Sequence, residues 1–140
     1  MQPDLAREAP LPKVLIVDDH ESIRRNLRLS LESAGFTVSG EAVNGFDAIE
    51  KAQAVIPDLV ILDLAMPEMN GLEAAAALKH ITPGVPLILL TAHASREVEL
   101  AAFSAGVCAV FSKYGELDAL IEHASAIIQA PAEERVHRVA

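Results

Sequence analysis

The 140-residue chain has no tryptophan, one tyrosine and one cysteine, Cys108. A single cysteine cannot form an internal disulfide, and such sparse use of cysteine suits the reducing cytoplasm. No apolar run approaches the roughly 20 residues that a membrane-spanning helix needs. Residues 1–12 lack the apolar core of a secretory signal. These absences predict a cytoplasmic protein that makes no membrane contact.

Basic residues are also scarce: 11 lysines and arginines stand against 20 acidic residues, which gives a net charge of −9. Binding to a nucleic-acid backbone requires a surface rich in lysine and arginine. We therefore expect no nucleic-acid contact by this segment itself. The hydrophobic fraction of 51% and the chain length fit one globular domain with a substantial core.

The ends of the chain differ in composition from its middle. Residues 1–12 include three prolines and are expected to form a disordered leader. Residues 13–129 carry the hydrophobic patterns and are expected to form the folded domain. Residues 130–140 contain Pro131 and paired charges without an apolar period, which is typical of a tail or the start of a linker.

Three short apolar runs, at 14–17, 59–62 and 87–90, lack the alternation of a half-exposed strand. Such runs are typical of strands that are buried on both faces of a parallel sheet. Residues 36–40 alternate more and indicate an edge strand, and residues 107–112 are expected to be the last strand. The pattern thus predicts five strands.

Helical patterns separate these strands. Gly35 and Gly106 are expected to end the first and fourth helices, and Ser95 to cap the start of the fourth. Alternation of strands and helices predicts right-handed βαβ crossovers and a parallel sheet that is covered on both faces. By analogy, we expect a flavodoxin-like (βα)5 three-layer α/β sandwich with strand order 2-1-3-4-5.

Polar side chains stand at the ends of four expected strands: Asp18 with Asp19, then Asp63, Thr91 and Lys113. In the order 2-1-3-4-5 these four strands are neighbours. Their carboxyl ends then meet at one edge of the sheet, where open α/β folds bind ligands. Asp63 alone would indicate no more than the start of a turn, but the other polar strand ends favour a site.

Three carboxylates in so small a space repel one another, and a bound cation relieves this repulsion. Mg²⁺ takes oxygen ligands and is often held by one or two carboxylates and a phosphate oxygen, whereas structural zinc sites use cysteine and histidine. Lysine and threonine can both contact phosphoryl oxygens, and carboxylates can form aspartyl-phosphates. These residues therefore predict Mg²⁺-dependent phosphoryl chemistry.

The sequence resembles the receiver domains of two-component response regulators. The resemblance covers about residues 13–129 and rests on four segments that follow one another in order: 14–20 (VLIVDDH), 58–67 (DLVILDLAMP) with Asn70-Gly71 after it, 89–92 (LLTA) and 111–113 (FSK). Each segment alone is weak evidence, but the four together are specific. The first and last segments are similar to receivers of transcription regulators with a LuxR/NarL-type DNA-binding domain.

The resemblance implies a role for each acidic residue. Asp63 would accept a phosphoryl group from a phosphohistidine of a sensor histidine kinase. Asp19, Asp63 and the backbone carbonyl of Ala65 would bind Mg²⁺ directly, and Asp18 would hold a water molecule of the metal.

Lys113 would contact a phosphoryl oxygen, and Thr91 would turn toward the phosphate once it is present. Receivers also catalyse their own dephosphorylation, and no other enzymatic activity is implied. Phosphorylation would change the surface built from residues 94–122, through which the family also forms homodimers. The output partner stays open; the resemblance favours transcription.

Two positions depart from the common receiver pattern. Tyr114 follows Lys113 where receivers usually have proline with a cis peptide. A non-proline cis bond costs about 2.5–4 kcal/mol, so we expect a trans bond. Val110 stands where many receivers have an aromatic residue whose rotation reports phosphorylation, and Phe111 should point to the opposite face of the sheet.

Two other functions remain as alternatives. A Mg²⁺-dependent phosphatase could also act through an aspartyl-phosphate, but hydrolases of the haloacid-dehalogenase group usually have a second aspartate two residues after the nucleophile, where this chain has Ala65. The other alternative is a receiver-like interaction module that is never phosphorylated. The complete set of five site side chains counts against it.

Overall fold

The computed structural model describes residues 10–129, so the proposed tail at 130–140 and most of the proposed leader lie outside the described residues. In the described range, strands and helices alternate. Their order is β1 (Lys13–Val17), α2 (Glu21–Ser33), β2 (Thr37–Ala42), α3 (Gly45–Ala54), β3 (Leu59–Leu62), α4 (Gly71–Ile81), β4 (Leu87–Thr91), α5 (Arg96–Ser104), β5 (Ala109–Ser112) and α6 (Leu117–Gln129).

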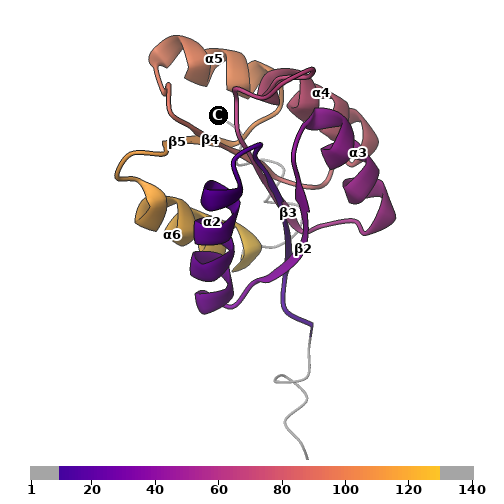
Figure 1. Cartoon of the computed structure of the whole chain (residues 1–140), viewed down its shortest axis with the longest axis vertical. Helices are drawn as coiled ribbons and strands as arrows, with labels where there is room; N and C mark the ends of the chain where they lie inside the picture. Colours follow the sequence, from indigo (N-terminus) through magenta and orange to yellow (C-terminus); the bar gives the residue numbers. More distant parts are fainter. Residues whose placement is uncertain (1–9, 130–140) are drawn as a thin grey trace, which may run out of the picture.

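All strand pairs are parallel, and the five-stranded sheet has the order β2-β1-β3-β4-β5. Helices α2 and α6 cover one face of the sheet, and α3, α4 and α5 cover the other (Figure 1). The expected flavodoxin-like sandwich and its strand order are therefore confirmed. None of the helices in the described range is both long and apolar enough to cross a membrane.

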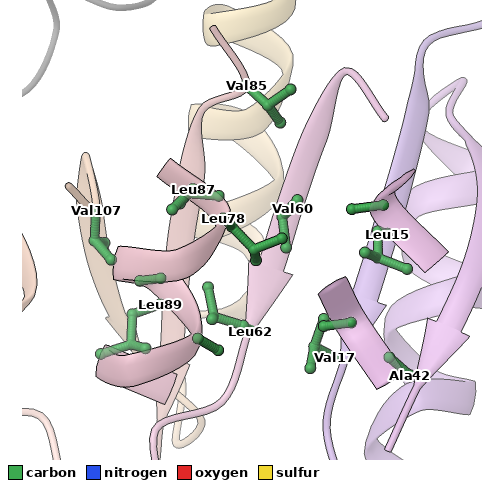
Figure 2. Packing of buried hydrophobic residues seen from close by; sticks show 14 of the residues in the cluster. Leu15, Val17, Ala42, Val60, Leu62, Leu78, Val85, Leu87, Leu89 and Val107 are labelled. Carbon is green, nitrogen blue, oxygen red and sulfur yellow. The ribbon is translucent and has the colours of Figure 1, made fainter. Parts of the chain in front are cut away.

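The core has two halves because successive side chains of a strand point to opposite faces of the sheet. In β1, Leu15 and Val17 face α3 and α4, whereas Val14 and Ile16 face α2 and α6. Figure 2 shows the first half, in which leucines and valines from the strands pack against Leu78 of α4. Burial on both faces explains why the central strands are continuously apolar.

The helix ends follow the local signals in the sequence. Ser95 caps α5, since its hydroxyl accepts a hydrogen bond from the Val98 N–H at 3.1 Å. Asn70 and Glu73 form a reciprocal capping box at the start of α4. Gly35 and Gly106, which follow α2 and α5, have φ values of +95° and +99° that favour glycine.

The last strand differs from its expected bounds, since β5 begins at Ala109 rather than at 107. Cys108 lies just before the strand and is buried, and its N–H donates to the Leu87 carbonyl at 2.9 Å. An apolar sequence pattern cannot separate such a buried approach to the sheet from the strand itself, because both exclude water.

Gly71 allows the loop after β3 to pack closely on the backbone. Its N–H donates to the Leu64 carbonyl at 2.7 Å. A Cβ atom on residue 71 would lie 2.1 Å from the Asp63 carbonyl oxygen and 2.8 Å from the Leu64 Cα. Since both atoms belong to the backbone, a side chain at 71 would have to displace the segment that carries Asp63.

We predict that Gly71→Ala lowers the free energy of unfolding by about 2–3 kcal/mol, the upper part of the range for overpacked sites. Gly84→Ala is the matched control, because an added Cβ there meets no atom within 4 Å. It should change stability by no more than about 1 kcal/mol. Urea denaturation of both variants measures the difference, and equal stabilities would contradict the close approach at Gly71.

Candidate functional site

The sheet places the functional side chains by extending its hydrogen bonds one residue past three strands. The Asp18 N–H donates to the Ala42 carbonyl at 3.0 Å, the Asp63 N–H to Val17 at 2.9 Å, and the Lys113 N–H to Thr91 at 2.9 Å. Each of these three donors directly follows its strand. The backbone of all three residues is therefore as fixed as the sheet itself.

Lys113 joins the two buried acids of the site. Its Nζ lies 2.7 Å from Asp18 Oδ2 and 3.3 Å from Asp63 Oδ2. The side chains of Asp18 and Asp63 are only 1% and 4% exposed, and that of Lys113 is 11% exposed. The strand ends at 18, 63 and 113 thus meet as the sequence predicted.

The charges of this group shift its protonation equilibria. Burial raises the pKa of Asp63, the Asp18 carboxylate raises it further, and Lys113 opposes both effects. Burial works to lower the pKa of Lys113, but its bonds to Asp18 and Asp63 outweigh burial and raise the pKa. Lys113 therefore stays charged, while the negative charge of Asp63 is not fully compensated.

Asp19 and His20 complete a group that could hold a metal ion. One potential ligand atom from each of Asp18, Asp19, His20 and Asp63 lies within 4.8 Å of the others. Carboxylate oxygens are the ligands that Mg²⁺ prefers, so Asp18, Asp19 and Asp63 fit this ion. The exposed His20 is the N-cap residue of α2, but its side chain makes no capping hydrogen bond; its Nδ1 lies 3.1 Å from Asp18 Oδ1 and 3.2 Å from Asp19 Oδ1.

Thr91 ends β4 next to this group and is fully buried. Its hydroxyl oxygen accepts a hydrogen bond from the His93 N–H at 3.1 Å. Ala65 lies in the loop between β3 and α4. That its carbonyl binds a metal ion remains a prediction.

Sequence reasoning missed Arg24, which contacts the backbone of Asp18, and Glu41, which holds Arg24 in place. It assigned no role to the edge strand β2, yet Glu41 of this strand pairs with Arg24 of α2, with 2.9 Å between Oε1 and Nε. Arg24 Nη1 also donates to the backbone carbonyl of Asp18 at 2.8 Å. Periodicity places Arg24 on the helix but does not show where so long a side chain reaches.

The two departures from the receiver pattern have the expected geometry. No peptide bond in the described range is cis, so Lys113–Tyr114 is trans. The Tyr114 N–H donates to the Ser112 hydroxyl at 3.0 Å, and the Tyr114 side chain is 76% exposed. Val110 packs on the α3–α5 side of the sheet, and Phe111 packs on the α2–α6 side.

A doubly covered parallel sheet with acids and a lysine at its carboxyl edge defines a flavodoxin-like α/β domain of the receiver type. The sequence profile of the response regulator receiver domain matches residues 14–125. The chain belongs to this family.

Relatives and solved structures agree with this assignment. A Pseudomonas aeruginosa relative that is described as a transcriptional regulator is 39% identical over 118 residues, which are 84% of this chain and 57% of the relative. The chemotaxis protein CheY of Thermotoga maritima is 39% identical over 94 residues, which are 67% of this chain and 78% of CheY. The chain thus spans little more than half of the first relative.

Two solved receivers superimpose well. The signal receiver domain of NarL from Mycobacterium tuberculosis has a TM-score of 0.80 at 26% identity, covering 87% of this chain and 99% of that one. A LuxR-family DNA-binding response regulator from Staphylococcus aureus has a TM-score of 0.78 at 25% identity, covering 85% of this chain and all of that one.

The raised pKa of Asp63 makes stability depend on pH. Because the folded-state pKa lies above the unfolded one, protonation of Asp63 favours folding. This contribution is complete below the unfolded pKa and is lost as the pH rises through the folded pKa. At neutral pH, the ionised Asp63 carboxylate therefore lowers stability.

We predict that Asp63→Asn is more stable than the wild type at pH 7 without divalent ions, and that the gap narrows as the pH falls. Chemical denaturation across this pH range measures the effect. Asp58→Asn is the matched control, since Asp58 precedes the same strand at the opposite edge and its carboxylate accepts the Lys13 N–H at 2.8 Å. If Asp63→Asn were instead less stable at neutral pH, the attraction of Lys113 for the Asp63 carboxylate would outweigh the cost of burying that charge.

Proposed function

We propose that the chain is the phosphoacceptor domain of a two-component system, with Asp63 as the residue that is phosphorylated. Membership in the receiver family supports this function. The observation that carries the assignment to Asp63 is its position: a nearly buried carboxylate that directly follows β3 and lies beside Asp18 and Lys113.

In this proposal, an Asp63 oxygen attacks the phosphorus atom of a phosphohistidine on a sensor histidine kinase. The bond between phosphorus and the histidine nitrogen breaks, and the imidazole leaves. Lys113 contacts the transferred phosphoryl group; its Nζ is already 3.3 Å from Asp63 Oδ2. The same site then supports hydrolysis of the aspartyl-phosphate.

Asp19, Asp63 and the Ala65 carbonyl are the proposed direct ligands of Mg²⁺, and Asp18 would hold a water molecule of the metal. The close approach of the acidic side chains supports this set. When bound, Mg²⁺ neutralises negative charge on the transferred oxygens. This chain's residues provide the pocket, the nucleophile and the ammonium group.

The proposed output is a change in the surface of α5, β5 and α6. Thr91 is the proposed start of this change, because its hydroxyl, which accepts a hydrogen bond from the His93 N–H, would turn to bind a phosphoryl oxygen. A DNA-binding partner domain and a homodimer formed through this surface are further parts of the proposal. The LuxR-family neighbour and the longer relative support control of transcription.

We predict that a small phosphodonor such as acetyl phosphate, with Mg²⁺, adds one acid-labile phosphoryl group to the wild type and none to Asp63→Asn. Intact-mass spectrometry and a phosphate-affinity gel measure the addition. Asp58→Asn should be phosphorylated like the wild type, because Asp58 lies at the other end of the strand. Excess EDTA should suppress the reaction.

Undiminished phosphorylation of Asp63→Asn would refute the assignment. Wild-type protein that neither binds Mg²⁺ nor takes up phosphate would favour a receiver-like interaction module instead. Rapid turnover of small phosphate esters would favour the phosphatase alternative, despite Ala65 at the position of its expected general acid.

We predict that Thr91→Val is still phosphorylated on Asp63, but that the change in α5 on phosphorylation is weaker than in the wild type. Valine fills the same buried volume without the hydroxyl that binds the phosphoryl oxygen. We expect smaller phosphorylation-dependent amide shifts in α5 by NMR than in the wild type. Thr82→Val is the control, since the Thr82 hydroxyl donates to the Leu78 carbonyl at the end of α4. If the phosphorylation-dependent amide shifts in α5 of Thr91→Val were as large as those of the wild type, transmission through the Thr91 hydroxyl would be excluded.

A further inference from the structure

Asp18 and Asp19 form the acid pair that follows β1, and the backbone of this pair is held from two sides. On one side, the Asp18 N–H donates to Ala42 at the end of β2. On the other, the Asp18 carbonyl accepts a hydrogen bond from Arg24 Nη1 at 2.8 Å. Because this carbonyl belongs to the peptide that joins Asp18 to Asp19, Arg24 fixes the plane of that peptide.

Arg24 is itself anchored. Its Nε donates to Glu41 Oε1 at 2.9 Å, and its side chain is only 14% exposed. Arg28 Nε holds the second oxygen of Glu41 at 2.8 Å. Burial works to raise the pKa of Glu41, but hydrogen bonds from Arg28 and Arg24 outweigh it and lower the pKa. Glu41 is therefore a charged anchor for both arginines.

Asp19 needs this support more than Asp18 does. The Asp18 carboxylate is buried and bound by Lys113, whereas the Asp19 side chain is 30% exposed and contacts the exposed His20. The direction of the Asp19 side chain depends on the backbone that precedes it. The hydrogen bond from Arg24 to Asp18 therefore orients Asp19 as well.

We propose that Arg24 is a positioning residue of the metal site. By binding the Asp18 carbonyl while anchored to Glu41, it keeps the Asp19 carboxylate within reach of Asp63. This inference rests on the proposed function, in which Asp19 and Asp63 bind Mg²⁺.

Arg28 provides a matched reference. Both arginines lie on α2 and pair with Glu41, but the second guanidinium contact of Arg28 goes to Glu32 at 3.2 Å rather than to Asp18. Arg24→Gln and Arg28→Gln each remove one positive charge and one bond to Glu41. Only Arg24→Gln removes the bond to the acid pair.

The test is a Mg²⁺ titration of the full 140-residue chain by calorimetry and by NMR. Partners of metal ligands typically contribute about 10–100-fold to metal affinity, and Arg24 acts through the backbone. We therefore expect Arg24→Gln to raise the Mg²⁺ dissociation constant about five- to tenfold, at or just below the lower end of that range. Arg28→Gln should stay within about twofold of the wild type, because exposed charges have small effects.

A second readout separates positioning from a general loss of stability. Without metal, the amide ¹⁵N resonance of Asp19 should shift in Arg24→Gln and not in Arg28→Gln, since its peptide loses a hydrogen bond only in the first. Should Arg24→Gln not fold, the wild type decides. Its Arg24 Nε–H resonance should then move with the Asp19 amide during the titration, while that of Arg28 stays in place.

The outcomes distinguish the role of Arg24 from the proposed metal site itself. Equal Mg²⁺ affinities and equal Asp19 shifts in the two variants would overturn the role of Arg24 and leave the proposed function intact. Absence of saturable Mg²⁺ binding by the wild type would overturn the proposed metal site, and the role of Arg24 with it.

Discussion

The ammonium group of Lys113 lies between the buried carboxylates of Asp18 and Asp63, and the arrangement of the site depends on it. Burial of an unpaired charge is strongly unfavourable, so such acids need a compensating cation. The sheet makes the compensation possible. Asp18, Asp63 and Lys113 follow three different strands, and β4 separates β3 from β5, so Lys113 has to reach across the end of β4.

Lys113 does not fully compensate the negative charge of the site, and this imbalance favours binding of a second cation. Lys113 approaches Asp18 more closely than Asp63, while Asp19 adds a further carboxylate. The raised pKa of Asp63 reflects both burial and the charge of Asp18. A divalent ion would relieve this repulsion and permit Asp63 to stay ionised, as the proposed nucleophile requires. The lower stability expected of the metal-free site at neutral pH follows from the same imbalance.

The sequence could predict the parts of this site that depend on the sheet. Continuous apolar runs indicated the central strands, and the first polar residue after each run gave Asp18, Asp63 and Thr91, while Lys113 directly follows the last predicted strand. The order of the strands then brought these side chains together at one edge of the sheet.

Contacts made by long, flexible side chains were not predictable in this way. Arg24 reaches both Glu41 and the Asp18 carbonyl, and Glu41 lies one residue past the edge strand predicted at 36–40, where the sequence indicates no more than an exposed charge. The start predicted for β5 was two residues too early for a related reason, since the buried Cys108 has the apolar character of a strand residue.

Val110 sets a constraint on how a phosphorylated state could reach the α5 surface. A β-branched side chain has few rotamers and is too small for the large swing of an aromatic ring. Phe111 packs on the opposite side of the sheet, against α6, where its ring lies 5.6 Å from that of His123. A connection that needs no aromatic ring is the hydrogen bond from the His93 N–H to the Thr91 hydroxyl, at the point where β4 leads into α5. If Thr91 turns toward a phosphoryl group, this N–H loses its acceptor, and the segment before α5 must find another. On the proposed function, the signal therefore passes through the backbone of the β4–α5 connection rather than through the rotation of a ring.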